Sequence, residues 1–266
     1  MKSVSGNDFV KTEMRGSVLH VTLCRPEAHN ALNAEIISGL TQIFKSVKSN
    51  TSVMAVVLRG DGPSFCAGGD LNWMKTSLKF SLAQNLKDTQ KLSDMYEAIF
   101  QCPAPVLGVA HGNVMGGGVG LTAVCDVVAA DTETKFCLSE VRLGLVPSII
   151  APYVLKKVPE SEIRPLMFTA EIFKGPHAAK IGLVHFTGTK TEAENFITNK
   201  LQLIVNNGPE ALRLTKQLIQ KIKTSSWAQA RQATVKTIAQ RRVSKEGQEG
   251  MNAFFEKRSP QWRRGQ

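Results

Sequence analysis

Residues 64–71 read Ser64-Phe65-Cys66-Ala67-Gly68-Gly69-Asp70-Leu71, and residues 111–118 read His111-Gly112-Asn113-Val114-Met115-Gly116-Gly117-Gly118. Both stretches are rich in small residues, and each follows a short apolar run, at 53–58 and 105–110 respectively. Such runs, when turn residues bound them, are typical of strands that are buried on both faces of a parallel sheet. Because ligands bind beyond the carboxyl ends of parallel strands, we predict that the two stretches line one crevice.

The rest of the chain continues the alternation of strands and helices. We predict a strand pair around the turn at Arg15-Gly16, a helix after Asn33 as its N-cap, a helix-prone stretch at 78–100 and a strand at 126–130. This alternation indicates an α/β fold with parallel strands. After a strand-like piece at 184–187, helical apolar spacing recurs at 191–205, 209–223 and 228–246. We therefore expect a core at 1–190 and a helical oligomerisation region at 191–266, with a soft boundary between them.

The composition excludes several classes of protein. The chain has no apolar run of ~18 residues, so we expect no membrane span, and its polar start lacks a signal region, which favours a cytoplasmic protein. Its 5 cysteines form no CxxC pair, so we expect reduced thiols and no zinc site. The net charge of +11 favours an anionic ligand, an acidic partner or nucleic acid. Late basic residues such as Arg241, Arg258 and Arg264 fit a solvated helical face equally well.

Motifs of nucleotide and metal sites fail at specific positions. A GxGxxG motif that starts at Gly116 would need glycine at 121, where the chain has Leu121. No P-loop, HExxH or GxSxG pattern occurs, and the histidines lack ligand spacing. We therefore expect neither a metal nor a separate cofactor.

The glycine-rich stretches and one glutamate are the candidates for chemistry. Glycines let backbone N–H groups approach a ligand, and a helix that starts near Gly117 would direct its positive end at an oxyanion. Two such N–H groups would form an oxyanion hole, unless the glycines only form tight turns. Glu140 stands in an apolar stretch at 138–147. Burial would make it a proton carrier, whereas pairing with Arg142 or capping of a backbone group would make it structural.

Together these stretches resemble the crotonase, or enoyl-CoA hydratase/isomerase, superfamily, with each motif in the family's order. The resemblance implies a spiral of ββα turns with C-terminal helices that complete a homotrimer or a hexamer of two trimers. It implies that the N–H groups of Gly69 and Gly117 hold the oxygen of a coenzyme A thioester while Glu140 exchanges a proton. It further implies substrate contacts from Arg25, Ala28, Ala67, Gly68, Asp70, Leu71, Gly116, Gly120 and Pro147.

One departure from the family's pattern bears on the reaction. Many hydratases of the family carry two glutamates that share a water molecule; the second matches Glu140, but the position of the first is Gly120 here. The main hypothesis is a hydratase that acts on an α,β-unsaturated acyl-CoA. The alternatives are a double-bond isomerase that uses Glu140 alone, and a protein that binds coenzyme A without turnover.

Within the family, the motifs, including Leu71-Asn72-Trp73-Met74, most resemble those of bacterial methylglutaconyl-CoA hydratases of leucine or terpene degradation. RNA binding through the basic surface is not expected, because only Phe254, Phe255 and Trp262 lie near the basic tail, and such binding needs interleaved aromatic residues.

Overall fold

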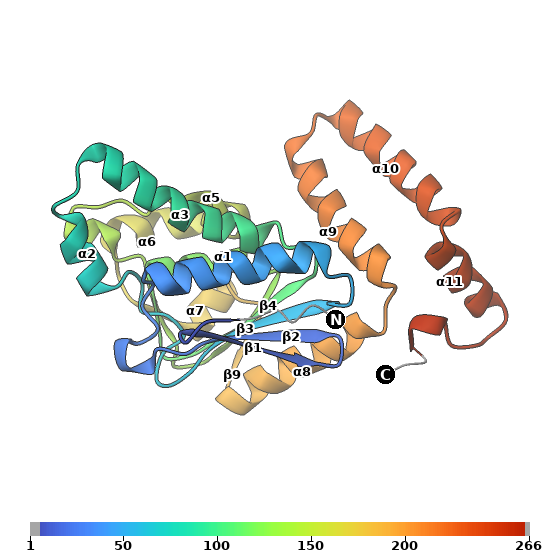
Figure 1. The fold of residues 1–266 in the computed structure, drawn as a ribbon, viewed down its shortest axis with the longest axis horizontal. Coiled ribbons are helices and arrows are strands. Elements are labelled where there is room, and N and C mark those ends of the chain that lie inside the picture. Colours follow the sequence, from blue (N-terminus) through green and yellow to red (C-terminus); the bar gives the residue numbers. More distant parts are fainter. Residues whose placement is uncertain (1–5, 264–266) are drawn as a thin grey trace.

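The computed structural model describes residues 6–263, which fold around a six-stranded sheet (Figure 1). The order is β1-β2-β3-β4-β6-β9. The first two strands are antiparallel, and every later neighbour is parallel, which confirms the predicted α/β arrangement. Arg264 lies outside the described residues. The strands are β1 (Val10–Arg15), β2 (Val18–Leu23), β3 (Ala55–Gly60), β4 (Val106–Ala110), β6 (Val127–Asp131) and β9 (Phe186–Gly188).

Both faces of the sheet are covered by helices, which explains the unbroken apolar runs of its strands. On β3, Val56 and Leu58 belong to the main core, whereas Ala55 and Val57 belong to a second core on the opposite face. Helices α1 (Ala34–Ser49) and α3 (Leu82–Phe100) cover the first face, and α8 (Lys190–Val205) covers the second (Figure 1). Because successive side chains of a strand point to opposite faces of the sheet, a single strand contributes side chains to two separate cores.

Local caps determine where the helices begin. Asn33 accepts a hydrogen bond from Ile36 N–H at 2.9 Å, as predicted for the N-cap of α1. The helix-prone stretch predicted at 78–100 is confirmed as α3, which begins four residues later than expected, and α2 before it was not predicted. Asp70 caps α2 (Leu71–Ser77), and Ser81 forms a capping box that starts α3.

A second, three-stranded sheet lies beside the first and was not predicted. It contains β5 (Asn113–Met115), β7 (Lys135–Cys137) and β8 (Phe173–Lys174), which are too short to leave a periodic signal. The remaining elements of the body are α4 (Gly117–Val124), α5 (Ala151–Lys157), α6 (Glu160–Thr169), α7 (Gly175–Lys180) and the short 3-10 helices Pro26–Ala28 and Glu140–Leu143.

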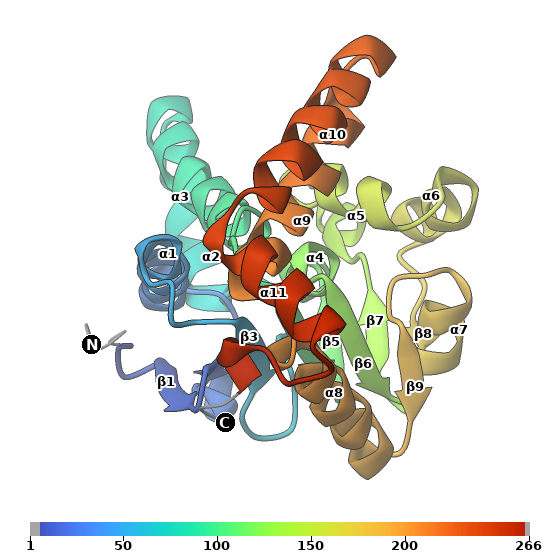
Figure 2. The same cartoon turned by 90° about the vertical axis from the view of Figure 1, so that its right-hand side faces the viewer.

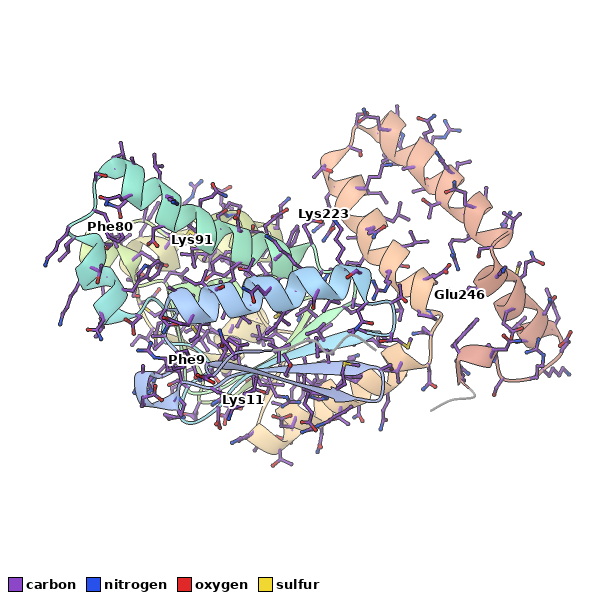
Figure 3. All side chains as sticks on the ribbon, in the orientation of Figure 1. Phe9, Lys11, Phe80, Lys91, Lys223 and Glu246 are labelled. Atoms are coloured by element: carbon purple, nitrogen blue, oxygen red, sulfur yellow. The ribbon has the colours of Figure 1, made fainter. Side chains whose placement is uncertain are left out.

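The last helices form a C-terminal arm that extends away from the sheet (Figures 1 and 2). The arm comprises α9 (Pro209–Thr224), α10 (Trp227–Arg242), α11 (Lys245–Phe255) and the 3-10 helix Gln261–Arg263. The predicted helix at 228–246 is wrong at its end, because Ser244 caps α11 after a break. Glu246 of α11, labelled in Figure 3, accepts the N–H groups of Glu210 and Ala211 at the start of α9. The division expected at 190 falls at the first residue of α8, but α8 packs on the sheet and the arm begins only at α9.

Two properties concern the whole of the described chain. Within residues 6–263, no helix is both long enough and apolar enough to cross a membrane. All five cysteines are free thiols, and four of them are buried, as predicted.

Candidate active site

The two glycine-rich loops meet beyond the carboxyl ends of β3 and β4, as predicted. Cys66 N–H donates to Asn113 O at 3.2 Å, and Met115 N–H donates to Cys66 O at 3.0 Å. On its other side the first loop meets Leu32, whose N–H donates to Gly68 O at 2.7 Å. Backbone hydrogen bonds therefore join three segments that are far apart in the sequence.

The closeness of these segments explains two of the glycines. A Cβ atom at Gly117 would lie 2.8 Å from Leu32 Cδ1 and 2.9 Å from Tyr96 Oη. Gly68 has a φ of +96°, and a Cβ atom there would lie 3.0 Å from Met115 O. Tight packing therefore explains why these two positions are glycines.

The N–H groups of Gly69 and Gly117 have no acceptor among the described residues. Leu32 pairs with the first loop as in a parallel sheet, because its N–H donates to Gly68 O and its carbonyl oxygen accepts from Asp70 N–H. Gly69 lies between these two residues, so its N–H group points to the opposite side. Gly117 is the first residue of α4, where helical N–H groups lack an internal partner. Both glycines line the same cavity, so the two free donors can stabilise a negatively charged oxygen there.

This cavity has a volume of about 330 Å³ and an apolar wall. Of the residues that line it, Glu140 and Tyr96 alone have ionisable side chains. Exposed Leu143, Leu145 and Val146 belong to its rim. The predicted site residues that line the cavity are Ala67, Gly68, Gly69, Leu71, Gly116, Gly117, Glu140 and Pro147.

Glu140 begins a short 3-10 helix, and its carboxyl group faces the second glycine loop. Its Oε1 lies 3.1 Å from the position of a Cβ atom at Gly116, and its buried Oε2 has no hydrogen-bond partner among the described residues. Burial raises the pKa of this carboxyl group above its usual range, and a hydrogen bond with its own backbone offsets only part of that effect. A desolvated carboxylate with one unpartnered oxygen and no cation beside it is suited to carry a proton.

The proposed pairing of Glu140 with Arg142 is wrong. Arg142 donates instead to Ala170 O at 2.6 Å. The guanidinium group therefore joins the 3-10 helix to the end of α6 and leaves the carboxylate of Glu140 uncompensated.

Arg25 and Asp70 form an ion pair, with 2.6 Å between Arg25 Nη1 and Asp70 Oδ2. Asp70 Oδ1 also accepts the N–H groups of Asn72 and Trp73 at the start of α2. Burial alone would raise the pKa of Asp70, but the hydrogen bonds from Trp73 and Arg25 outweigh it and lower the pKa. Arg25, Ala28 and Asp70 are not among the residues that line the cavity, so their contact with coenzyme A stays a prediction.

Gly120 does not line the cavity, although the resemblance implied that it contacts the substrate. Gly120 is buried in α4, and a Cβ atom there would lie 2.3 Å from Ile150 Cγ2 and 2.9 Å from Tyr96 Cε1. Ile150 and Tyr96 both line the cavity, whereas Gly120 lies behind them. A direct contact between Gly120 and a substrate is therefore not supported by this arrangement.

Sequence reasoning missed several side chains of the cavity, above all Tyr96 and Ile150. Tyr96 lies on the buried stripe of α3 with Met95 and Ile99. The helical period predicts that this stripe is buried, but it does not indicate which cavity the stripe meets. Trp73 and Met74 of α2 also line the cavity, although the sequence indicated them only as parts of a motif.

The chain is similar to known proteins over most of its length. Residues 13–265 match the family model for enoyl-CoA hydratase/isomerase. An enoyl-CoA hydratase from Shewanella pealeana has a similar structure, with a TM-score of 0.91 and 33% identity, over 96% of this chain and 96% of that one. The short-chain-enoyl-CoA hydratase of Clostridium acetobutylicum is 29% identical over 92% of this chain and 94% of its own. The peroxisomal Δ(3,5)-Δ(2,4)-dienoyl-CoA isomerase of Arabidopsis thaliana is 27% identical over 98% of both chains.

Proposed function

The chain belongs to the enoyl-CoA hydratase/isomerase family and is an enzyme of that family, and from this premise we propose that it adds water to an α,β-unsaturated acyl-CoA thioester or removes it. Its α/β fold with a helical C-terminal region is the crotonase fold of that family. One observation carries the proposal. The buried, unpartnered Oε2 of Glu140 and the free N–H groups of Gly69 and Gly117 belong to one cavity.

The proposed reaction uses these three groups in two steps. In the first step the carboxylate of Glu140 takes a proton from water, the water oxygen bonds to the β-carbon, and the electron pair of the double bond moves toward the thioester. The carbonyl oxygen then carries the negative charge, and the N–H groups of Gly69 and Gly117 stabilise it. In the second step Glu140 returns its proton to the α-carbon. One water has been added, and the carboxylate is restored.

The double-bond isomerase is the second candidate, because Glu140 is the one carboxylate among the residues that line the cavity. In that reaction Glu140 moves a proton between two carbons of the acyl chain, with the same enolate held by the same donors. Both reactions are represented by the named functions of the relatives.

The lining of the cavity favours an apolar acyl group of moderate size. No lysine, arginine or histidine is among the residues that line it, so a second carboxylate on the acyl chain would meet no cation there. A methylglutaconyl-CoA-like role in leucine catabolism stays a prediction, and this lining argues against it.

A homotrimer, or a hexamer of two trimers, forms part of the proposal. The C-terminal arm exposes large apolar side chains that a monomer would leave in water. The largest of them are Trp227, Phe254 and Phe255, each more than three-quarters exposed. A second subunit would bury this surface.

The experiment is a screen of purified protein against enoyl-CoA thioesters, read by mass spectrometry. Hydration adds the mass of one water to the product, and isomerisation leaves the mass unchanged. Glu140→Gln should lower turnover by about 10²–10⁴-fold while coenzyme A binding persists. Glu171→Gln, which changes an exposed glutamate, is the matched control. Wild-type protein that binds coenzyme A but turns over no thioester would refute the proposal.

A further inference from the structure

The space that a side chain at position 120 would need is filled from two other segments. A Cβ atom at Gly120 would lie 2.9 Å from Tyr96 Cε1 of α3 and 2.3 Å from Ile150 Cγ2. Ile150 brings only hydrocarbon to this place, whereas Tyr96 also brings a hydroxyl group. The tyrosine is fully buried, and it lines the cavity together with Glu140.

The hydroxyl group of Tyr96 has one proton, and that proton is already committed. Tyr96 Oη donates to Gly117 O at 2.8 Å. A phenol that donates one hydrogen bond can still accept others, so Tyr96 Oη remains available as an acceptor. The other two hydroxyl groups of the lining, on Ser139 and Ser148, belong to half-buried and exposed residues.

Tyr96 Oη and the carboxyl group of Glu140 flank adjacent residues of the second glycine loop. Tyr96 Oη lies 2.9 Å from the position of a Cβ atom at Gly117, and Glu140 Oε1 lies 3.1 Å from that of a Cβ atom at Gly116. Burial raises the pKa of Tyr96 well above its usual range, and the nearby carboxylate of Glu140 adds to the effect. The hydroxyl group therefore stays protonated at neutral pH and keeps its bond to Gly117.

We infer that Tyr96 Oη is the second acceptor for the attacking water and so replaces the carboxylate that many hydratases of the family carry at the position of Gly120. This inference rests on the proposed hydration. The water donates one hydrogen to Glu140 and the other to Tyr96 Oη. The first proton is transferred when the water oxygen bonds to the β-carbon, and the second stays on that oxygen as the hydroxyl hydrogen of the product. Tyr96 transfers no proton; it positions the water.

The test compares Tyr96→Phe with Tyr153→Phe. Tyr153 is the only other tyrosine of the chain; its ring centroid lies 6.0 Å from that of Tyr96, and its hydroxyl donates to Glu97 Oε2 at 3.0 Å. The control thus removes a neighbouring hydroxyl group that does not line the cavity. Each variant is assayed with the enoyl-CoA that the wild type hydrates fastest, and with its saturated counterpart in D₂O, where Glu140 and the oxyanion hole exchange an α-proton without attack by water.

Tyr96→Phe should lower kcat for hydration by about 10-fold or more, the factor expected from one lost hydrogen bond of ordinary strength. The KM and the rate of α-proton exchange should stay close to those of the wild type, and Tyr153→Phe should leave all three unchanged. An equal fall of hydration and exchange would show that Tyr96 acts through the Gly117 loop, and would overturn the inference. Unchanged hydration would overturn it too. A wild type that only isomerises would refute the proposed hydration itself, before any variant is measured.

Discussion

Substitution of Gly120 by alanine tests whether the place of the missing glutamate is filled. The added Cβ atom would lie 2.3 Å from Ile150 Cγ2 and 3.0 Å from Ile150 Cβ, well inside ordinary contact distance. Overpacking of this kind costs about 1–3 kcal/mol. Alanine gains about 0.5–1 kcal/mol over glycine in a helix interior, and position 120 is inside α4. The collision is severe, so we expect a net destabilisation of about 1–2 kcal/mol.

The assay is urea unfolding of four proteins: the wild type, Gly120→Ala, Ile150→Ala and the double variant. Ile150→Ala alone should cost about 2–5 kcal/mol, because the buried side chain leaves a cavity. In that background the collision with Cγ2 is gone, and only the milder contacts with Cβ of residue 150 at 3.0 Å and Tyr96 Cε1 at 2.9 Å remain, so Gly120→Ala should cost less than in the wild type. The cycle should therefore give a favourable coupling energy of about 1 kcal/mol. If Gly120→Ala stabilises the otherwise unchanged protein, the space is open and the reasoning is refuted.

The same contact decides what Gly120→Glu would do. Because the first carbon of the new side chain already collides with Ile150, we expect loss of folding stability and of activity with every substrate, crotonyl-CoA included. Retained hydration of crotonyl-CoA by this variant would contradict that expectation.

Three further predictions concern charge and assembly. Because burial raises the pKa of Glu140, the folded protein binds a proton more tightly at this group than the unfolded chain does, so the stability of the fold falls as the pH rises through that pKa. Glu140→Gln should therefore be more stable than the wild type at pH 7. A gain in stability that persists at pH 3 would contradict this. Asp70→Asn should cost about 1–3 kcal/mol at pH 7, where the lowered pKa keeps Asp70 ionised beside Arg25, and thermal melts should show the difference shrinking as the pH falls below about 4. Light scattering should give three or six subunits, and replacing Trp227 and Phe254 by serine should lower that mass; a wild-type monomer would refute the assembly.

Much of the fold could be predicted because its signals are local. The apolar run of β3, the Asn33 cap and the stripe of α1 are each contained in a few consecutive residues, and the structure confirms them. Helix α2 and the break after α10 were missed, although Asp70 and Ser244 are good caps. A cap residue in a polar stretch is easily taken for an ordinary helical position, since the stretch lacks the apolar contrast that would mark a boundary.

The sequence by itself determined the parallel sheet, the two glycine loops at its carboxyl edge and one acid in an apolar stretch. Only the tertiary structure decided that Glu140 Oε2 has no partner among the described residues, that Arg25 is held by Asp70 across 45 residues, and that Tyr96 and Ile150 occupy the space beside Gly120. Strands, turns and caps follow from the conformational preferences of neighbouring residues. The environment of a buried side chain depends on which distant segments pack against it, and no periodicity along the chain records that choice.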